Sequence, residues 1–189
     1  MTRPRIVLLG AGGHGKAGLD LLLAAGTHEV AGLLDGAPRM AEVLGRPVLG
    51  TEDLLPVLRA EGIAAAHPAI GDNAQRLAAG GRLEAAGVGL PPLLHPAARF
   101  GGGPLRGAAG VVMAGAVVGP EARIGRLALV NTGAIVEHDC ELGEGAHVAP
   151  GAVLAGHVRL GARVMVGAGA VMVPGVQGGD GARIGAGAA

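Results

Sequence analysis

The segment NTGAIVEHDCE, residues 131–141, gathers side chains that could move a proton. His138 stands between Glu137 and Asp139, and a carboxylate can hold one ring nitrogen of a histidine while the other nitrogen acts as a base. Acyl transfer to an amine or hydroxyl needs such a base, because the acceptor must lose a proton as it attacks a thioester. His138 is therefore a candidate general base, and a surface histidine on a polar face is the alternative.

A second group of residues, near the start of the chain, could bind phosphate. In RIVLLGAGGHGK an aliphatic run ends in Gly10, Gly12 and Gly15, which fit the pattern G-x-G-x-x-G. Bare backbone N–H groups at the N-terminus of a helix bind phosphate groups. Asp35 follows at the end of the next apolar run, about 20 residues on, where a dinucleotide-binding fold places a ribose-binding carboxylate.

These residues predict a site for a nucleotide or nucleotide sugar. The expected contacts come from Gly12, Gly13, His14 and Asp35. The alternatives are a purely structural turn, a solvent-facing His14 and a hydride-transferring dehydrogenase. The dehydrogenase is disfavoured because the chain before the repeat described below is too short for a separate substrate domain.

The elements that would position the phosphate site alternate between strand and helix. We expect a strand that starts at Arg5, a helix over residues 16–26 with apolar spacing around Leu19, Leu22 and Leu23, and a second strand over residues 29–34. A third apolar segment, residues 62–70, runs into Gly71-Asp72-Asn73. This order predicts an α/β, Rossmann-like subdomain with a short parallel sheet over residues 1–90, ending at a Gly- and Pro-rich junction at residues 87–92.

The rest of the chain, residues 91–189, repeats with a period of six. Written in sixes from Leu94, every unit opens on a large apolar residue except those at Arg106 and Gly178, and the fifth position is always Ala, Val, Cys, Gly or Pro. A period of six matches neither a helix nor an ordinary strand. It predicts short strands and turns that coil into a β-solenoid, with first and fifth positions facing inward. Cys140 is then a small core thiol and not a nucleophile, and Gly156 stacks one coil of 18 residues after His138.

Composition narrows the class of partner. The formal net charge is +0 and no block of like charge occurs, so nothing indicates nucleic acid or an anionic membrane surface. A single cysteine fits a reducing compartment, and no stretch approaches the ~20 apolar residues of a membrane span. We therefore expect a cytoplasmic protein.

The repeat resembles the hexapeptide-repeat acyltransferases. The chain is also similar to the family of sialic-acid O-acetyltransferases and of bacillosamine and perosamine N-acetyltransferases. Four features carry this resemblance: GAGGHG, Asp35, IGDN and NTGAIVEHDCELGEGAHVAPGAVLAG. The resemblance implies that the solenoid is a left-handed parallel β-helix, against the usual handedness of crossovers. It also implies acetyl-CoA as co-substrate, no metal, and a homotrimer with active sites between neighbouring solenoids.

The resemblance further assigns roles to single residues. His138 is the base and Asp139 orients it; His147, Gly156 and Asn131 lie at acetyl-CoA, with the Gly156 N–H at the thioester carbonyl. In the first subdomain, Gly12, Gly13, His14 and Asp35 hold the nucleotide sugar. Members of the family usually continue past the last G-A-G-A with a further strand and tail, which normally help to hold CoA.

The expected activity is acetylation of the amino group of a nucleotide-linked amino sugar. O-acetylation of a sialic acid is the first alternative, and a non-catalytic scaffold that binds a sugar nucleotide or CoA is the second. A third alternative is a zinc enzyme like the gamma-type carbonic anhydrases, which would use His138, His147 and His157.

Overall fold

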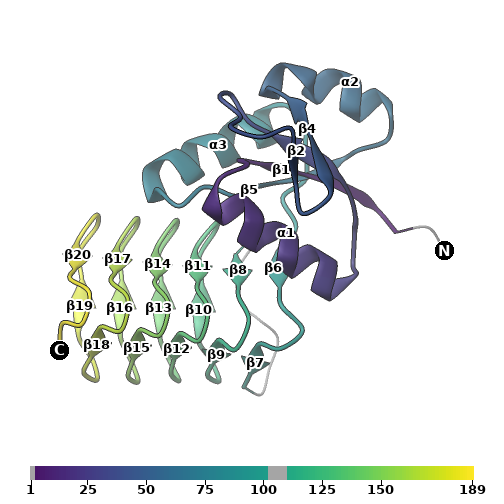
Figure 1. Ribbon diagram of the computed structural model, residues 1–189. Helices are drawn as coiled ribbons and strands as arrows, with labels where there is room; N and C mark the ends of the chain where they lie inside the picture. The colour runs from purple at the N-terminus through teal and green to yellow at the C-terminus, as the bar shows by residue number, and fades with distance from the viewer. Residues whose placement is uncertain (1–2, 102–109) are drawn as a thin grey trace. The chain divides into compact units, whose positions relative to one another are not determined.

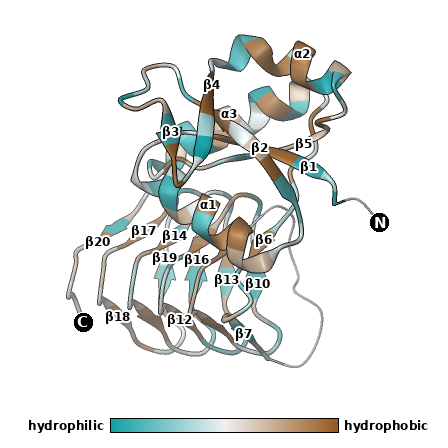
Figure 2. Ribbon diagram, turned by 45° about the vertical axis from the view of Figure 1, so that its right-hand side comes forward, coloured by the Kyte–Doolittle hydropathy of each residue, from teal (hydrophilic) through white to brown (hydrophobic). Residues whose placement is uncertain are grey.

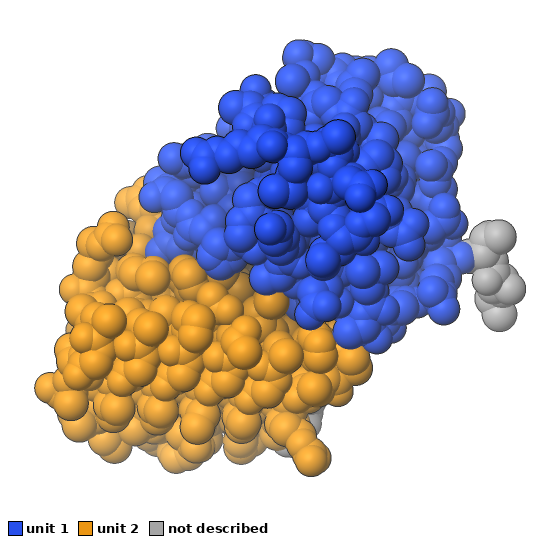
Figure 3. Space-filling view, in the orientation of Figure 1, with its two compact units in different colours: residues 1–91 blue, residues 92–189 orange. Residues whose placement is uncertain are grey.

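The computed structural model describes residues 3–101 and 110–189 and divides the chain into two compact units, Met1–Pro91 and Pro92–Ala189 (Figure 3). Arg106, one of the two exceptions at the first position of the repeat, lies outside the described residues. Among the described residues, no helix is long and apolar enough to cross a membrane.

The first unit is built on one five-stranded sheet in the order β3-β4-β2-β1-β5 (Figure 1). Its strands are β1 (Arg5–Leu9), β2 (Glu29–Leu34), β3 (Glu42–Val43), β4 (Arg46–Gly50) and β5 (Ala65–Pro68). Its helices are α1 (Gly13–Ala25), the 3-10 turn η1 (Glu52–Leu54), α2 (Leu55–Ala60) and α3 (Asn73–Ala85). β1 pairs in parallel with β2 and with β5, which confirms the predicted parallel sheet.

Three details of this unit differ from the prediction. β3 and β4 form an antiparallel hairpin that the pattern did not indicate, because β3 has only two residues. Helix α1 begins at Gly13, before the predicted start, because the loop glycines form its first turn: the Lys16 N–H donates to the Gly12 carbonyl at 3.0 Å. On α1, Leu23 is exposed and Leu21 is buried in its place, and Figure 2 shows both hydrophobic and hydrophilic residues along the helix.

The second unit is the predicted left-handed parallel β-helix, whose coils stack from β6 to β20 (Figure 1). Its first face consists of β6 (Leu93–Leu94), β8 (Val111–Val112), β11 (Leu129–Val130), β14 (His147–Val148), β17 (Met165–Val166) and β20 (Arg183–Ile184). Its second face consists of β7 (Arg99–Phe100), β9 (Val117–Val118), β12 (Ile135–Val136), β15 (Val153–Leu154) and β18 (Val171–Met172). Its third face consists of β10 (Arg123–Ile124), β13 (Glu141–Leu142), β16 (Arg159–Leu160) and β19 (Gln177–Gly178).

The register is one coil of 18 residues, so that Leu129 pairs with His147 on the first face and Ile135 pairs with Val153 on the second. Every buried member of the hydrophobic cluster inside the coils occupies a first or a fifth position of the sequence repeat. The fifth positions are small because two strand faces converge there, and Cys140 is fully buried in such a position. Apolar burial along the axis therefore stabilises the stack, together with the backbone hydrogen bonds between successive coils.

The corners of the coils use left-handed backbone at the fourth position of the repeat. Glycine supplies it at Gly133, Gly151 and Gly169, because glycine adopts positive φ without a steric penalty. The same conformation, with φ of 54° to 61°, occurs at five described residues of the coils that carry side chains: Glu121, Leu127, Asp139, His157 and Arg163. Side chains are retained at these corner positions at a conformational cost.

Candidate active site

The candidate base lies at the corner between the second and third faces, which we call the second corner. His138 and Asp139 occupy the turn between β12 and β13, and the His138 Nδ1 lies 2.8 Å from the Asp139 Oδ2. The hydrogen bond from His138 lowers the pKa of Asp139, so the carboxylate stays ionised. An ionised carboxylate accepts a hydrogen bond from Nδ1–H, so a neutral His138 ring has its free lone pair on Nε2.

Gly156 lies against the ring of His138, one coil later at the same corner. A Cβ built on Gly156 would stand 2.5 Å from Cε1 and 2.6 Å from Nε2 of His138, so only glycine leaves the ring this position. The Gly156 carbonyl accepts from the Gly175 N–H at 3.0 Å. No carbonyl within residues 3–101 and 110–189 accepts from the Gly156 N–H. A backbone donor is therefore available beside the candidate base.

His157 completes a group at the second corner that sequence reasoning set aside except as a zinc ligand. Its Nε2 lies 3.7 Å from the Asp139 Oδ2, and its ring meets the His138 ring edge-on, with centroids 5.2 Å apart. The His157 N–H donates to the His138 carbonyl at 3.0 Å, which links the two coils. The sequence held two signals for His157. It lies one coil of 18 residues after Asp139, and it places a histidine at a turn position that glycine often occupies.

A second group lies at the corner between the first and second faces, which we call the first corner. The Asn131 Nδ2 lies 3.1 Å from the Nε2 of His147, and the Asn131 Oδ1 accepts from the Thr132 N–H at 2.8 Å. The bond from Thr132 orients the amide so that its NH₂ group faces the imidazole and donates to it. His147 is 5% exposed on β14, so its ring is held in one orientation.

The two groups do not meet within one chain. Residues 131–134 form the turn that follows β11, and residues 137–140 form the turn that follows β12, so one strand of the second face separates them. His147 is therefore not brought together with His138 and His157 within one chain; the zinc-enzyme alternative, which places its ion between subunits, stays a prediction. A site that uses both groups requires two copies of the chain.

The glycine loop of the first unit borders a cavity of about 280 Å³. The lining includes Gly12, Gly13 and Asp35, as the sequence predicts, together with Lys16 and Arg39. A Cβ on Gly12 or Gly13 would meet no atom within 4 Å, so the space above the N-terminus of α1 is open. Two cations and a helix N-terminus suit an anionic ligand. Lys16 was noticed in the sequence only as the residue after the loop, and Arg39 carried no signal.

Asp35 has a structural role that the sequence did not predict. Its Oδ2 accepts from the Ala11 N–H at 2.8 Å and its Oδ1 accepts from the Ala37 N–H at 2.9 Å. The carboxylate therefore ties the glycine loop to the turn after β2. Each carboxylate oxygen can accept a further hydrogen bond, so Asp35 keeps the capacity to bind a ligand.

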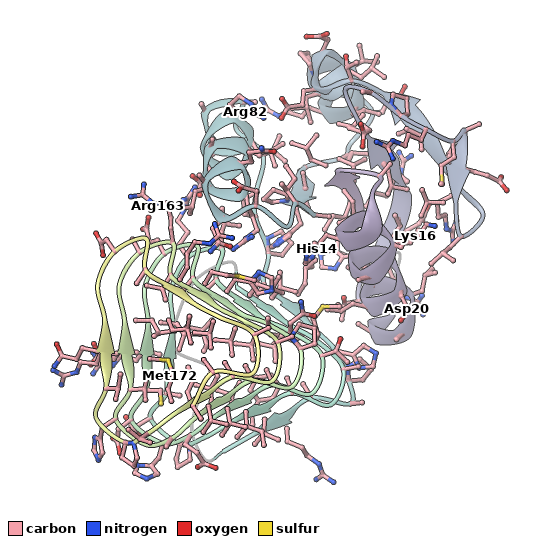
Figure 4. The ribbon with its side chains drawn as sticks, turned by 60° about the vertical axis from the view of Figure 1, so that its left-hand side comes forward. His14, Lys16, Asp20, Arg82, Arg163 and Met172 are labelled. Carbon is pink, nitrogen blue, oxygen red and sulfur yellow. The ribbon has the colours of Figure 1, made fainter. Side chains whose placement is uncertain are left out.

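His14 does not line this cavity. Figure 4 shows His14 and Lys16 leaving α1 on different sides, and the His14 ring lies so close to Gly71 that a Cβ there would stand 2.6 Å from its Cδ2. Burial, and then the charge of Arg76, lower the pKa of His14, which favours a neutral ring. Arg76 is 2% exposed and donates to the carbonyls of Ile70 and Gly71 at 3.0 and 3.1 Å. The sequence segment IGDN was noticed, but the buried arginine that shapes it was not.

Comparisons with known proteins agree with this architecture. Residues 5–80 match the family model of the PglD N-terminal domain. PerB from Caulobacter crescentus, solved with CoA and GDP-perosamine, is 40% identical, with a TM-score of 0.91 over 96% of this chain and 86% of that one. The acetyltransferase domain of PglB from Neisseria gonorrhoeae, solved with acetyl coenzyme A, is 36% identical, with a TM-score of 0.89 over 98% of this chain and 89% of that one. A search of curated proteins found no match.

Proposed function

Because the chain belongs to the family of hexapeptide-repeat sugar acyltransferases that includes PerB and the acetyltransferase domain of PglB, we propose that it transfers an acetyl group from acetyl-CoA to the amino group of a nucleotide-linked amino sugar. The observation that carries this proposal is the 2.8 Å contact between His138 Nδ1 and Asp139 Oδ2, with Gly156 against the ring. The relatives suggest the substrate class, because PerB is a GDP-perosamine N-acetyltransferase.

In the proposed reaction the neutral amine attacks the thioester carbonyl and forms a tetrahedral intermediate. The Nε2 of His138 takes the proton that the amine loses, and Asp139 stabilises the imidazolium through Nδ1–H without being protonated itself. The Gly156 N–H donates to the oxyanion. When the intermediate collapses, the carbon–sulfur bond breaks and the imidazolium returns its proton to the sulfur of CoA, so His138 is neutral again.

The donor site in this proposal forms between copies of the chain. Asn131 and His147 of one copy contact acetyl-CoA near its thioester, and His138 of the neighbouring copy faces the same thioester. The separation of the first and second corners within one chain supports this arrangement. A closed ring of three copies would form three such sites, which is the predicted homotrimer.

The acceptor's nucleotide occupies the cavity at the glycine loop in this proposal. The N–H groups of Gly12 and Gly13 and the cations of Lys16 and Arg39 face its diphosphate, and Asp35 accepts a hydrogen bond from the nucleoside. His14, which lies on another side of α1, is proposed to donate or accept a hydrogen bond at the sugar. A hydroxyl acceptor would use the same base, so O-acetylation of a sugar remains the alternative activity.

CoA release with a panel of acceptors tests the proposal. Acetyl-CoA is offered with UDP-, GDP- and dTDP-linked 4-amino sugars and with free sialic acid, and wild type is compared with His138→Ala and the control His28→Gln. We expect turnover with a nucleotide-linked amino sugar that falls about 10²–10⁴-fold in His138→Ala and is kept in the control. Turnover with sialic acid alone would support O-acetylation. Binding of CoA without any turnover would support the scaffold.

A further inference from the structure

The second corner gathers three side chains of the kind that bind transition metals. One ligand atom each from His138, Asp139 and His157 lies within 4.8 Å of the others. The shortest separation is the 2.8 Å from His138 Nδ1 to Asp139 Oδ2, and His157 Nε2 stands 3.7 Å from the same oxygen. The other histidine of the repeat with an assigned role, His147, is held by Asn131 at the first corner and does not join this group.

We propose that His138, Asp139 and His157 form a binding site for one divalent transition-metal ion per chain, with Zn²⁺ as the reference ion, and that the bound ion inhibits acetyl transfer. The ion is an inhibitor in this proposal and takes no part in the reaction. The inhibitory part rests on the proposed role of His138 as the base, whereas the binding part stands on geometry alone.

The ligand set fits such an ion. Zn²⁺ binds imidazole nitrogen and carboxylate oxygen at about 2.0–2.2 Å, and three protein ligands leave a fourth position for water. The three side chains are 51%, 45% and 65% exposed, so they can turn by the small amount needed to converge on one ion. Their backbones are fixed: the Asp139 N–H donates to the Pro120 carbonyl at 3.1 Å and the His157 N–H donates to the His138 carbonyl at 3.0 Å.

Two of the ligands occupy corner positions with left-handed backbone. Asp139 and His157 are consecutive members of one stack along the second corner, with Glu121 before them and Gly175 after them. Positive φ is uncommon for residues with a side chain, although Asp and His tolerate it better than most. The left-handed backbone directs both side chains outward at the same corner, one coil apart.

Inhibition follows from the tautomer of His138. In the metal-free site Nδ1 carries the proton, which it donates to Asp139, and Nε2 holds the lone pair that acts as the base. An ion that binds Nδ1 needs the lone pair there, so the ring of a neutral His138 must carry its proton on Nε2. With its proton on Nε2, the ring has no free lone pair on the side that faces Gly156. Nε2 can then accept no proton from the amine. The ion also takes Asp139 away from its role in orienting the ring.

Co²⁺ absorption and Zn²⁺ inhibition test the two parts separately, on the full chain. Co²⁺ in an ordered site of nitrogen and oxygen ligands gives visible d–d bands, which Zn²⁺ removes by displacement. We expect one Co²⁺ per chain in wild type. Loss of a residue that only supports a metal ligand typically weakens metal binding by about 10–100-fold. His157→Gln, which removes a ligand itself, should weaken Co²⁺ binding by at least this factor. Asp139→Asn should weaken it as well. His28→Gln, which changes a histidine of the other unit, should bind like wild type.

In the activity assay, Zn²⁺ should inhibit wild type and His28→Gln, and EDTA should reverse the inhibition. His157→Gln, with its inhibition measured relative to its own metal-free turnover, should require at least about 10-fold more Zn²⁺ for half inhibition, in line with its weaker binding. Absence of a Co²⁺ spectrum in wild type, or an unchanged spectrum in both His157→Gln and Asp139→Asn, would overturn the site. Binding at this site without inhibition would confirm the site and overturn the inhibitory role, and it would count against His138 as the base.

Discussion

Replacement of Gly156 by alanine should damage catalysis while leaving the fold nearly intact. The added Cβ would stand 2.5 Å from Cε1 of His138, whereas carbon atoms in contact lie about 3.5–4.0 Å apart, so the ring must move by about 1 Å. The ring is the end of a half-exposed side chain and can move at little cost in folding free energy. A displacement of about 1 Å at a reacting group can cost about 10²-fold in rate, which corresponds to about 2.7 kcal/mol.

Gly181→Ala is the matched control. Gly181 lies at a different corner with φ of 70° and open space around the new Cβ, so the substitution costs about 1 kcal/mol of folding free energy through its left-handed backbone alone. Urea unfolding and steady-state CoA release should therefore separate the two variants. Gly156→Ala should lose kcat and keep its stability, and Gly181→Ala should do the reverse. Wild-type kcat in Gly156→Ala would refute the argument that Gly156 positions His138, as would a loss of kcat that simply followed loss of folded protein.

Three further predictions concern the first unit. Burial lowers the pKa of His67 to about 4, so the folded chain does not bind the proton that the unfolded chain binds below about pH 6.5. The free energy of unfolding should therefore fall by up to roughly 3 kcal/mol as the pH falls from 6.5 to 4. Urea titrations at each pH should show a flatter dependence for His67→Gln. Gly15→Ala should destabilise the chain by about 1–3 kcal/mol in the same assay, because its Cβ would overlap the backbone carbonyl of Gly10, which cannot move aside. Lys16→Ala and Arg39→Ala should each raise the KM for the nucleotide sugar about 10-fold, because each removes one charge-assisted contact, and should leave the KM for acetyl-CoA unchanged. A rise in the KM for acetyl-CoA instead would contradict the placement of the nucleotide.

The repeat made the second unit predictable because each coil sees the same environment. A side chain that points into a narrow prism must be aliphatic at one position and small at another in every coil, so the pattern appears in the sequence wherever the prism continues. The first unit was predictable where strands are long and apolar, as at β1 and β2. The hairpin of β3 and β4 was missed because a two-residue strand carries no period, and its turn at Leu44 and Gly45 has no strong turn dipeptide.

The candidate site divides in the same way. His138 and Asp139 were predicted together because they are adjacent in the chain, and Gly156 could be placed beside them because the coil has a constant length. Arg39 and Arg76 were not found, because the path of the chain after β2 brings Arg39 to the glycine loop and the path after β5 brings Arg76 to the carbonyls of Ile70 and Gly71, and neither path leaves a local pattern. His14 was assigned to the nucleotide sugar from its position in the loop, and this stays a prediction; its side chain leaves α1 on a different side from Lys16.

The sequence by itself determined the repeat, the order of the elements, the glycine loop and the pairing of the candidate base with its carboxylate, because all of these depend on neighbours in the chain or on a fixed period. Only the tertiary structure decided which of these side chains contact one another. It brought the Nε2 of His157 to 3.7 Å from the Asp139 Oδ2, one coil away, and set the Asn131 amide against His147. The physical reason is that spacing along the chain specifies the phase of a residue around the coil, whereas the direction of a side chain depends on the backbone conformation at its corner and on the coils packed against it.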